Sequence, residues 1–294
     1  MRPYATRQDE VDAALLAAIE EFRVDPEPRL ALLEAAAAAQ AGPPLLPVNM
    51  IDAETVIGPL WLPAEDTLIT PLIQQYGFWE PDLCAFFEAR IKPGMRFVDV
   101  GANLGYFSVV ASRLVGPTGQ VVAVEPGERS AAVLRANLWR HGCRNTVLVP
   151  AAAWYETTHV QFELNPDGGS GDWVNPYEKR GEAVVVAAAA LDDLLDAPVH
   201  GIKTDAQGAD HLVLRGMART LANSPDVEVV VEFLPTLPNL YGDPQREVLR
   251  EYRDMGFDLF FLDPVGVPTR VTDDEVMGTG ADILNLCLRR PGKG

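Results

Sequence analysis

A strand pattern that runs into a glycine-bracketed turn and then into a helix pattern is the feature that most constrains how this chain folds. Residues 96–100 fit a short buried strand, with apolar side chains at Phe97, Val98 and Val100. Apolar positions then recur at helical spacing, at Phe107, Val110, Ala111 and Leu114. Gly101 and Gly105 lie between the two patterns, and because glycine has no Cβ, the connection can turn sharply and let a ligand lie against the backbone. The stretch therefore predicts a strand, a tight loop and a helix that together present a nucleotide-sized contact surface.

A carboxylate at the end of the next apolar run indicates which ligand the loop receives. The run 120–124 predicts a second parallel strand, and Glu125 follows it directly. A carboxylate at this point can accept hydrogen bonds from the hydroxyls of a ribose. The glycine spacing is Gly-x-x-x-Gly, which differs from the Gly-x-Gly-x-x-Gly of loops that bind a pyrophosphate. We therefore expect a nucleoside without a diphosphate, of which S-adenosylmethionine is the common one. A glycine turn that only packs helix on strand is the alternative.

The size and charge of the chain narrow the choice of partner. Its 294 residues suffice for one α/β domain with an appendage. A formal net charge of −18 would repel a nucleic-acid backbone or an anionic membrane at long range, so we expect neither as a partner. We expect a small-molecule substrate instead. The three cysteines are widely separated and form no Cys-x-x-Cys pair, and no apolar run is long enough to span a bilayer. These features favour a cytoplasmic protein in a reducing compartment.

An N-terminal extension, residues 1–74, precedes the strand and helix alternation. Two amphipathic or alanine-rich helices are predicted, one behind Asp9 with an apolar face that ends at Phe22, and one over 29–40. A short strand pair or hairpin is predicted over 55–62, with Gly58 and Pro59 as the break. The helices are compatible with a lid, with a homodimer surface or with a packing appendage.

The segment before the first strand and the segment after the third strand both supply candidate cofactor contacts. Pro81 suits the first turn of a helix, which places Glu80 where it can face a cofactor ammonium or simply complement the helix dipole. A third strand over 146–149 is followed by small residues, Ala152 and Ala153, that admit an adenine ring. Trp154 then either stacks on the ligand or fills the core.

Residues 159–186 interrupt the alternation of strands and helices. Two apolar runs flank a glycine-rich loop, which predicts a hairpin with a long tip. Loops of this length in a compact domain are usually functional or disordered. The tip is therefore a candidate substrate cover, through Asp172, Trp173, Asn175 and Tyr177.

Two later strands end in carboxylates. The strand 202–204 delivers Asp205 to the carboxyl edge of the sheet, where open α/β sheets bind their ligands, and the strand 227–233 delivers Glu232 to the same edge. A helix is predicted over 211–221 and another over 244–255, followed by an antiparallel-type strand pair over 257–262 and 283–288.

The chain resembles the FkbM-type family of S-adenosylmethionine-dependent methyltransferases. The resemblance rests on three motifs in order: F-V-D-V-G-A-N-L-G-Y-F-S at 97–108, Glu125-Pro126, and K-T-D-A-Q-G at 203–208. It covers roughly residues 75–262 and implies a class I (Rossmann-like) methyltransferase: an α/β fold with a seven-stranded mixed sheet and helices on both faces, in a domain of residues 75–294 with the hairpin inserted at 159–186. It also implies methyl transfer, commonly to a hydroxyl of a secondary metabolite such as an antibiotic, or of a sugar.

The same resemblance assigns roles to individual residues. The methionine part of the cofactor is expected on loop residues Asp99, Gly101, Asn103 and Gly105. The next two residues, Tyr106 and Phe107, are also expected to bind the cofactor. Glu125 is expected to hold the ribose beside Pro126, and Asp205 with Gln207 to line the transfer site. Two residues depart from the family pattern, because Thr204 replaces an apolar residue and Gln207 stands where many members have glutamate.

The chemistry of methyl transfer leaves several alternatives open. A hydroxyl nucleophile must lose a proton during attack, and Asp205, Glu232 or His211 is the candidate base. Asp205 and Glu232 are also compatible with a Mg²⁺ site, but two oxygen ligands without a third favour a site without metal. A nicotinamide-dependent oxidoreductase, disfavoured by the glycine spacing, and a non-catalytic S-adenosylmethionine-binding or scaffold protein are the alternative functions.

Overall fold

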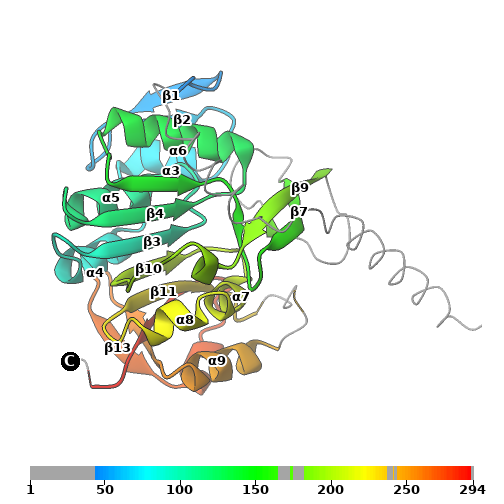
Figure 1. Cartoon of the computed structure of the whole chain (residues 1–294). Coiled ribbons are helices and arrows are strands. Elements are labelled where there is room, and N and C mark those ends of the chain that lie inside the picture. Colours follow the sequence, from blue (N-terminus) through cyan, green and yellow to red (C-terminus); the bar gives the residue numbers. More distant parts are fainter. Residues whose placement is uncertain (1–43, 165–172, 175–181, 237–240, 242–243, 293–294) are drawn as a thin grey trace, which may run out of the picture.

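An eight-stranded mixed sheet forms the centre of the molecule (Figure 1). The computed structural model describes residues 44–164, 173–174, 182–236, 241 and 244–292. The strand order is β13-β12-β14-β11-β10-β3-β4-β5, and the five strands from β11 to β5 run parallel. The strands are β3 (Arg96–Val100), β4 (Gln120–Val124), β5 (Thr146–Val149), β10 (Gly201–Thr204), β11 (Glu228–Phe233), β12 (Asp258–Leu262), β13 (Pro268–Val271) and β14 (Leu284–Arg289).

The predicted class I fold is confirmed, with one correction to the strand count. The antiparallel pair predicted near the C-terminus is β12 with β14, and β13 adds an eighth strand at the edge. Its sequence begins with Pro268 and was not predicted as a strand. A proline at the first position of an edge strand is tolerated because its missing N–H faces away from the neighbouring strand.

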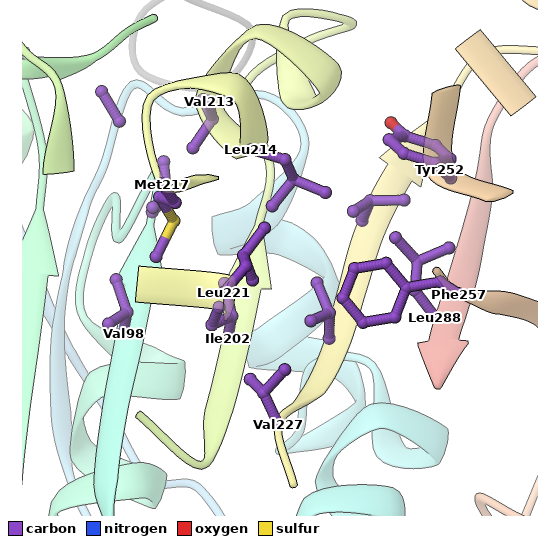
Figure 2. Close-up of a cluster of buried hydrophobic side chains, with 14 of the residues drawn as sticks. Val98, Ile202, Val213, Leu214, Met217, Leu221, Val227, Tyr252, Phe257 and Leu288 are labelled. Atoms are coloured by element: carbon purple, nitrogen blue, oxygen red, sulfur yellow. The ribbon is translucent and has the colours of Figure 1, made fainter. Parts of the chain in front are cut away.

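Helices cover both faces of the sheet, because neighbouring residues of each central strand point to opposite sides. One layer contains α4 (Pro81–Arg90), α5 (Tyr106–Val115) and α6 (Glu128–Arg140). The other contains α7 (Asp210–Arg215), α8 (Ala218–Ala222) and α9 (Gln245–Asp254). On β3, Phe97 packs with α4 and α5, whereas Val98 packs with the opposite layer. Figure 2 shows that second core, where Leu214 and Leu221 of the helices meet Ile202 of the sheet.

The helix predicted over 211–221 is wrong as one element, because it is broken into α7 and α8 at Gly216. A Cβ at Gly216 would lie 2.0 Å from the carbonyl oxygen of Trp154, so the break lets two backbone segments pack directly together. The carbonyl of Gly216 also accepts a hydrogen bond from the N–H of Asp192. A tertiary contact, invisible in the helical periodicity, therefore interrupts the helix.

The described part of the N-terminal extension packs on α5 and α6. It consists of the hairpin β1 (Met50–Ala53) and β2 (Leu60–Pro63) and the helix α3 (Ile69–Tyr76). Leu60 and Leu62 are buried in one cluster with side chains of α5 and α6. The side chain of Asn137 on α6 also accepts from the backbone N–H of Trp61 and donates to its carbonyl. The two helices predicted ahead of this hairpin lie outside the described residues.

A second, four-stranded sheet stands beside the carboxyl end of the main sheet (Figure 1). It contains β6 (Ala152–Ala153), β7 (Thr158–Leu164), β8 (Trp173–Val174) and β9 (Glu182–Ala189). The predicted hairpin is the antiparallel pair of β7 and β9. Of the predicted cover residues, Asp172, Asn175 and Tyr177 lie outside the described residues. The short helices η1 (Leu191–Asp193) and α10 (Asp273–Met277) complete the described elements. Among the helices described, none is long and apolar enough to cross a bilayer.

Candidate active site

A cavity of about 310 Å³ lies at the carboxyl ends of the central strands. This volume is at the lower end of the range for small-molecule sites, about 300–1,000 Å³. The residues predicted to form the site and found in its lining are Glu80, Gly101, Asn103, Glu125, Pro126, Ala152, Ala153, Asp205, Gln207 and Glu232. Phe162 of β7 and Val174 of β8 form part of the wall, so the second sheet borders the cavity. Residues that are more than 150 positions apart in the sequence thus meet at one edge of the sheet.

The backbone around the cavity is strained in a way that is typical of functional sites. Gly101 has a φ of +67°, and a Cβ there would lie 2.1 Å from the carbonyl oxygen of Asp205. Four non-glycine residues in the described part of the chain have positive φ, and Glu80, Asn103 and Gln207 of the cavity lining are three of them. Such conformations cost free energy and persist where the surrounding structure enforces them. Gly101 therefore allows the loop after β3 and the loop after β10 to touch.

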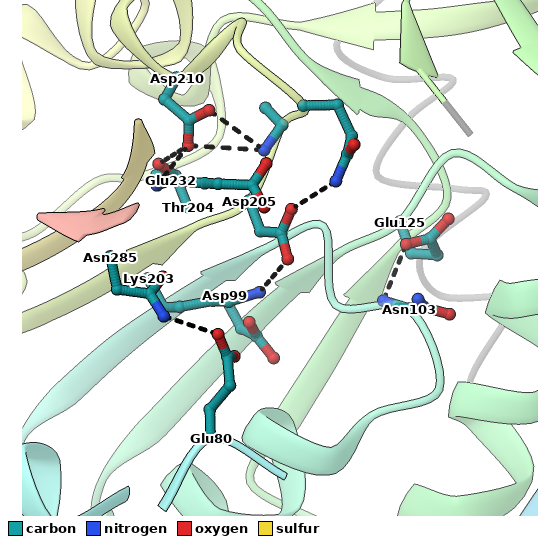
Figure 3. Close-up of polar contacts among 12 residues, drawn as sticks. Glu80, Asp99, Asn103, Glu125, Lys203, Thr204, Asp205, Asp210, Glu232 and Asn285 are labelled. Atoms are coloured by element: carbon teal, nitrogen blue, oxygen red, sulfur yellow. Dashed lines mark hydrogen bonds and ion pairs between the residues drawn. The ribbon is translucent and has the colours of Figure 1, made fainter. Parts of the chain in front are cut away.

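Glu125 is a buried carboxylate held by two backbone amides. Its Oε2 accepts a hydrogen bond of 2.8 Å from the N–H of Asn103 (Figure 3), and its Oε1 accepts one of 2.8 Å from the N–H of Gly127. The bond to Asn103 ties the glycine loop to the end of β4. Each carboxylate oxygen can accept more than one hydrogen bond, so Glu125 can also serve a ligand.

Lys203 supplies the positive charge of the site from inside a buried strand. Its Nζ lies 3.2 Å from Oδ2 of Asp205 and 5.3 Å above the centre of the Phe107 ring. The amide of Gln207 donates to the other carboxylate oxygen of Asp205 at 3.0 Å. Although burial alone lowers the pKa of Lys203, the surrounding carboxylates, Asp205 and Asp99 above all, raise it above its ordinary value. Lys203 is therefore a permanent cation, and Asp205 is held by donors on both oxygens.

Two further carboxyl groups lie near Lys203. Glu80 lines the cavity, and its Oε1 accepts a hydrogen bond of 2.6 Å from the amide of Asn285 on β14. Burial raises the pKa of Glu80, and Lys203 and Asn285 oppose the rise. Asp99 is fully buried beneath the cavity rather than in its lining, and Ser108 donates to it at 2.6 Å. Burial likewise raises the pKa of Asp99.

Glu232 and Asp210 form a second acidic pair behind Asp205. Burial, followed by Asp205 and Asp210, raises the pKa of Glu232 to about 10. Burial raises the pKa of Asp210 to about 6. The hydroxyl of Thr204 donates to Asp210, which explains why a polar residue stands at this buried strand position. The departure of Thr204 from the apolar family pattern is thus matched by a buried acceptor.

Six of the predicted site residues lie outside the cavity lining. Gly105 packs against α6, where a Cβ would lie 2.5 Å from Cδ1 of Leu134. Trp154 packs against Tyr241 at 5.7 Å between ring centres, and His211 lies 6.3 Å from the same ring. His211 is 1% exposed, so it is a core residue and not a surface one. The full set outside the lining is Asp99, Gly105, Tyr106, Phe107, Trp154 and His211.

The position of Lys203 among the carboxyl groups of the site was not predicted from the sequence. The available signal was a lysine inside a strand that is otherwise buried and short, Gly201–Thr204. A charged residue is almost never fully buried unless it is paired, so the pattern predicts buried carboxylates around it. In the described ranges, no group of three or more His, Cys, Asp or Glu side chains is arranged to hold a metal ion.

Comparison with known proteins identifies relatives. A family model described as the methyltransferase FkbM domain matches residues 99–259, which is more than half of the chain. A probable cobalt-precorrin-6B C(15)-methyltransferase (decarboxylating) of Thermoplasma volcanium is 33% identical over 115 residues, which cover 36% of this chain and 57% of that protein. A protein-L-isoaspartate O-methyltransferase of Thermotoga maritima is 33% identical over 78 residues, which cover 26% of this chain and 25% of that protein. The chain therefore spans less than two thirds of the length of these relatives.

Among solved structures, a methyltransferase FkbM from Methylobacillus flagellatus KT aligns with a TM-score of 0.44 and 12% sequence identity. The alignment covers 70% of this chain and 50% of that one.

Proposed function

This chain belongs to the FkbM methyltransferase family, and from that premise we propose that it transfers the methyl group of S-adenosylmethionine to a hydroxyl oxygen of a small natural product or sugar. One observation carries the proposal. The same cavity that contains Glu125 and the glycine loop also contains Asp205 and Glu232 at the neighbouring strand ends. Under this proposal the cofactor and the group that accepts the proton lie next to each other.

The residues present fit this cofactor. Oδ1 of Asn103 is buried and has no hydrogen-bond partner within the described part of the chain, so it lacks a donor that an ammonium group would supply. Glu80 lines the same cavity and adds a carboxyl group for that ammonium. Glu125 has acceptor capacity for ribose hydroxyls. Ala152 and Ala153 leave room for a flat purine ring beside them.

The chain's own residues would have two tasks in the reaction. When bound, the cofactor supplies an electrophilic methyl group on a sulfonium. The protein must align a hydroxyl with that methyl group and accept the proton that the hydroxyl loses.

Of the three candidate bases, Glu232 fits the second task best. His211 lies in the core against Tyr241, outside the cavity lining. Both oxygens of Asp205 already accept hydrogen bonds from Lys203 and Gln207. Glu232 lines the cavity, and its Oε2 has no hydrogen-bond partner among the described residues. We therefore assign proton acceptance to Glu232 and orientation of the acceptor to Asp205.

Titration calorimetry followed by product analysis tests the proposal. The protein is titrated with S-adenosylmethionine, S-adenosylhomocysteine and NADH. It is then incubated with S-adenosylmethionine and a panel of hydroxylated metabolites, and mass spectrometry looks for products that are heavier by about one CH₂ group. Binding of the first two ligands and a methylated product support the proposal. Binding of NADH alone contradicts it, and cofactor binding without any methylated product across the panel favours a binding protein without catalysis.

A further inference from the structure

Glu232 occupies an unusual place in the cavity. It is the second-last residue of β11, and its register partner on the antiparallel strand β14 is Asn285. The amide of Asn285 is committed to Glu80, to which it donates at 2.6 Å. Oε2 of Glu232 is buried without a hydrogen-bond partner in the part of the chain that the structure describes. A carboxyl group in this setting has little to stabilise its ionised form.

The charged groups that face Glu232 are mostly of the same sign. Asp205 in the loop after β10, Asp210 on α7 and Glu80 before α4 all act on it, and Lys203 on β10 is the one cation acting against them in the described residues. That ammonium lies 3.2 Å from Asp205, with which it is already paired. Figure 3 shows these side chains around the end of β10. One cation thus serves several carboxyl groups, and burial with this repulsion raises the pKa of Glu232 to about 10.

Resting on the function proposed above, we propose that Glu232 carries a proton in the free enzyme and releases it when the sulfonium cation of S-adenosylmethionine enters the cavity. A second positive charge beside the acidic group favours the ionised form of Glu232, because opposite charges attract strongly where water is excluded. The cofactor therefore creates the base that the reaction needs. The free enzyme, and the enzyme with the demethylated product, keep Glu232 neutral.

The transfer step balances with this assignment. The proton of the acceptor hydroxyl passes to Oε2 of Glu232, and a lone pair of the hydroxyl oxygen forms the new bond to the methyl carbon. The bond between that carbon and sulfur breaks, and its electron pair stays on sulfur. The positive charge on sulfur and the negative charge on Glu232 disappear together, so the buried cavity gains no net charge during the step.

Proton release on binding tests the inference directly. The wild-type protein is titrated by calorimetry at pH 8 with S-adenosylmethionine and separately with S-adenosylhomocysteine, each in two buffers of different ionisation enthalpy. We expect about one more proton released per sulfonium bound than per product bound. The ratio of the two affinities should then change by up to about tenfold per pH unit between pH 7 and 9, in favour of the sulfonium at higher pH. Titration of groups shared by the two ligands cancels in this ratio.

Two variants locate the proton. Glu232→Gln should abolish the difference in proton release and make the affinity ratio independent of pH. Glu156→Gln removes an exposed glutamate before β7 and should behave as the wild type does. The wild-type comparison of the two ligands needs no variant, so it stands even if Glu232→Gln fails to fold.

The outcomes separate the inference from the proposed function. If S-adenosylmethionine and S-adenosylhomocysteine both bind and release the same number of protons, the inference is overturned while the methyltransferase proposal stands. An excess of released protons that persists in Glu232→Gln overturns the assignment to Glu232. If neither ligand binds, both the inference and the proposed function fail.

Discussion

The ammonium of Lys203 on β10 lies 3.2 Å from the carboxylate of Asp205, the residue that directly follows this strand. Lys203 is 5% exposed, and the ring of Phe107 lies under its ammonium. Buried charges are costly unless they are paired and hydrogen-bonded. This pair therefore fixes the geometry at the centre of the candidate active site.

Replacing Lys203 by methionine should destabilise the fold. The change leaves Asp99 and Asp205 without their cation. Because removal of one partner of a buried pair leaves an uncompensated charge, we expect a loss of about 2–4 kcal/mol in the free energy of unfolding. Urea denaturation measures the loss. Lys92→Met, at an exposed lysine after α4, serves as the control and should change the free energy by less than about 1 kcal/mol. Equal stability of the two variants would mean that the buried pair has no net effect.

Replacing Gly101 by alanine should lower the free energy of unfolding by more than the strain of the left-handed backbone alone. Gly142 provides a matched control, because its φ of +65° is close to the +67° of Gly101, whereas a Cβ at Gly142 would meet no atom within 4 Å. Gly142→Ala should cost about 1–2 kcal/mol from the left-handed backbone. Gly101→Ala should cost a further ~1–3 kcal/mol, because its Cβ would collide with the carbonyl of Asp205. Thermal and urea unfolding of both variants measure the difference, and equal losses would refute the close approach.

Replacing Glu125 by glutamine should weaken cofactor binding through the ribose. We expect a loss of about 1–3 kcal/mol in binding free energy to S-adenosylhomocysteine, because charged hydrogen bonds become neutral ones. A ligand analogue that lacks the ribose 2′-hydroxyl completes a double-mutant cycle. The wild type should lose affinity for this analogue, whereas Glu125→Gln should lose much less. Additive losses would rule out the ribose contact. Unfolding curves measure what the substitution costs the fold, because the single carbonyl oxygen of a glutamine can accept from only one of the N–H groups of Asn103 and Gly127.

The raised pKa of Glu232 predicts how stability depends on pH. An ordinary glutamate ionises near 4.5, and folding raises the pKa of Glu232 to about 10, so between these values the folded chain holds a proton that the unfolded chain has lost. The stabilising contribution is present at low pH and declines as the pH rises through this window, by at most about 1.4 kcal/mol per pH unit. The wild type should therefore lose stability relative to Glu232→Gln between pH 6 and 9. If the free energies of unfolding of the two proteins changed equally with pH over this range, Glu232 would be ionised in the folded protein.

Most of the sheet and the side of the cavity formed by the glycine loop and Glu125 could be predicted from the sequence. Parallel strands buried on both faces give short apolar runs, and the residue that follows each run lies at the carboxyl edge. For this reason Glu125, Asp205 and Glu232 could be placed together without coordinates. Their shared edge depends only on strand direction and order.

Other features depend on contacts that periodicity does not encode. The break at Gly216 follows from the approach of the Trp154 backbone, and the burial of Trp154 itself follows from Tyr241, far along the chain. Gly105 looks like a ligand-binding glycine in the motif, yet it accommodates Leu134 of α6. Local sequence showed that these residues are special, and only the packing shows what they touch.

A structure of the protein with S-adenosylhomocysteine bound tests the central claim most directly. The account predicts the ribose hydroxyls on Glu125, the amino group near Asn103 and Glu80, and the sulfur on the side of the cavity formed by Asp205 and Glu232. Density for the ligand elsewhere on the protein, or a cavity closed by the protein's own side chains in the presence of saturating ligand, would contradict it.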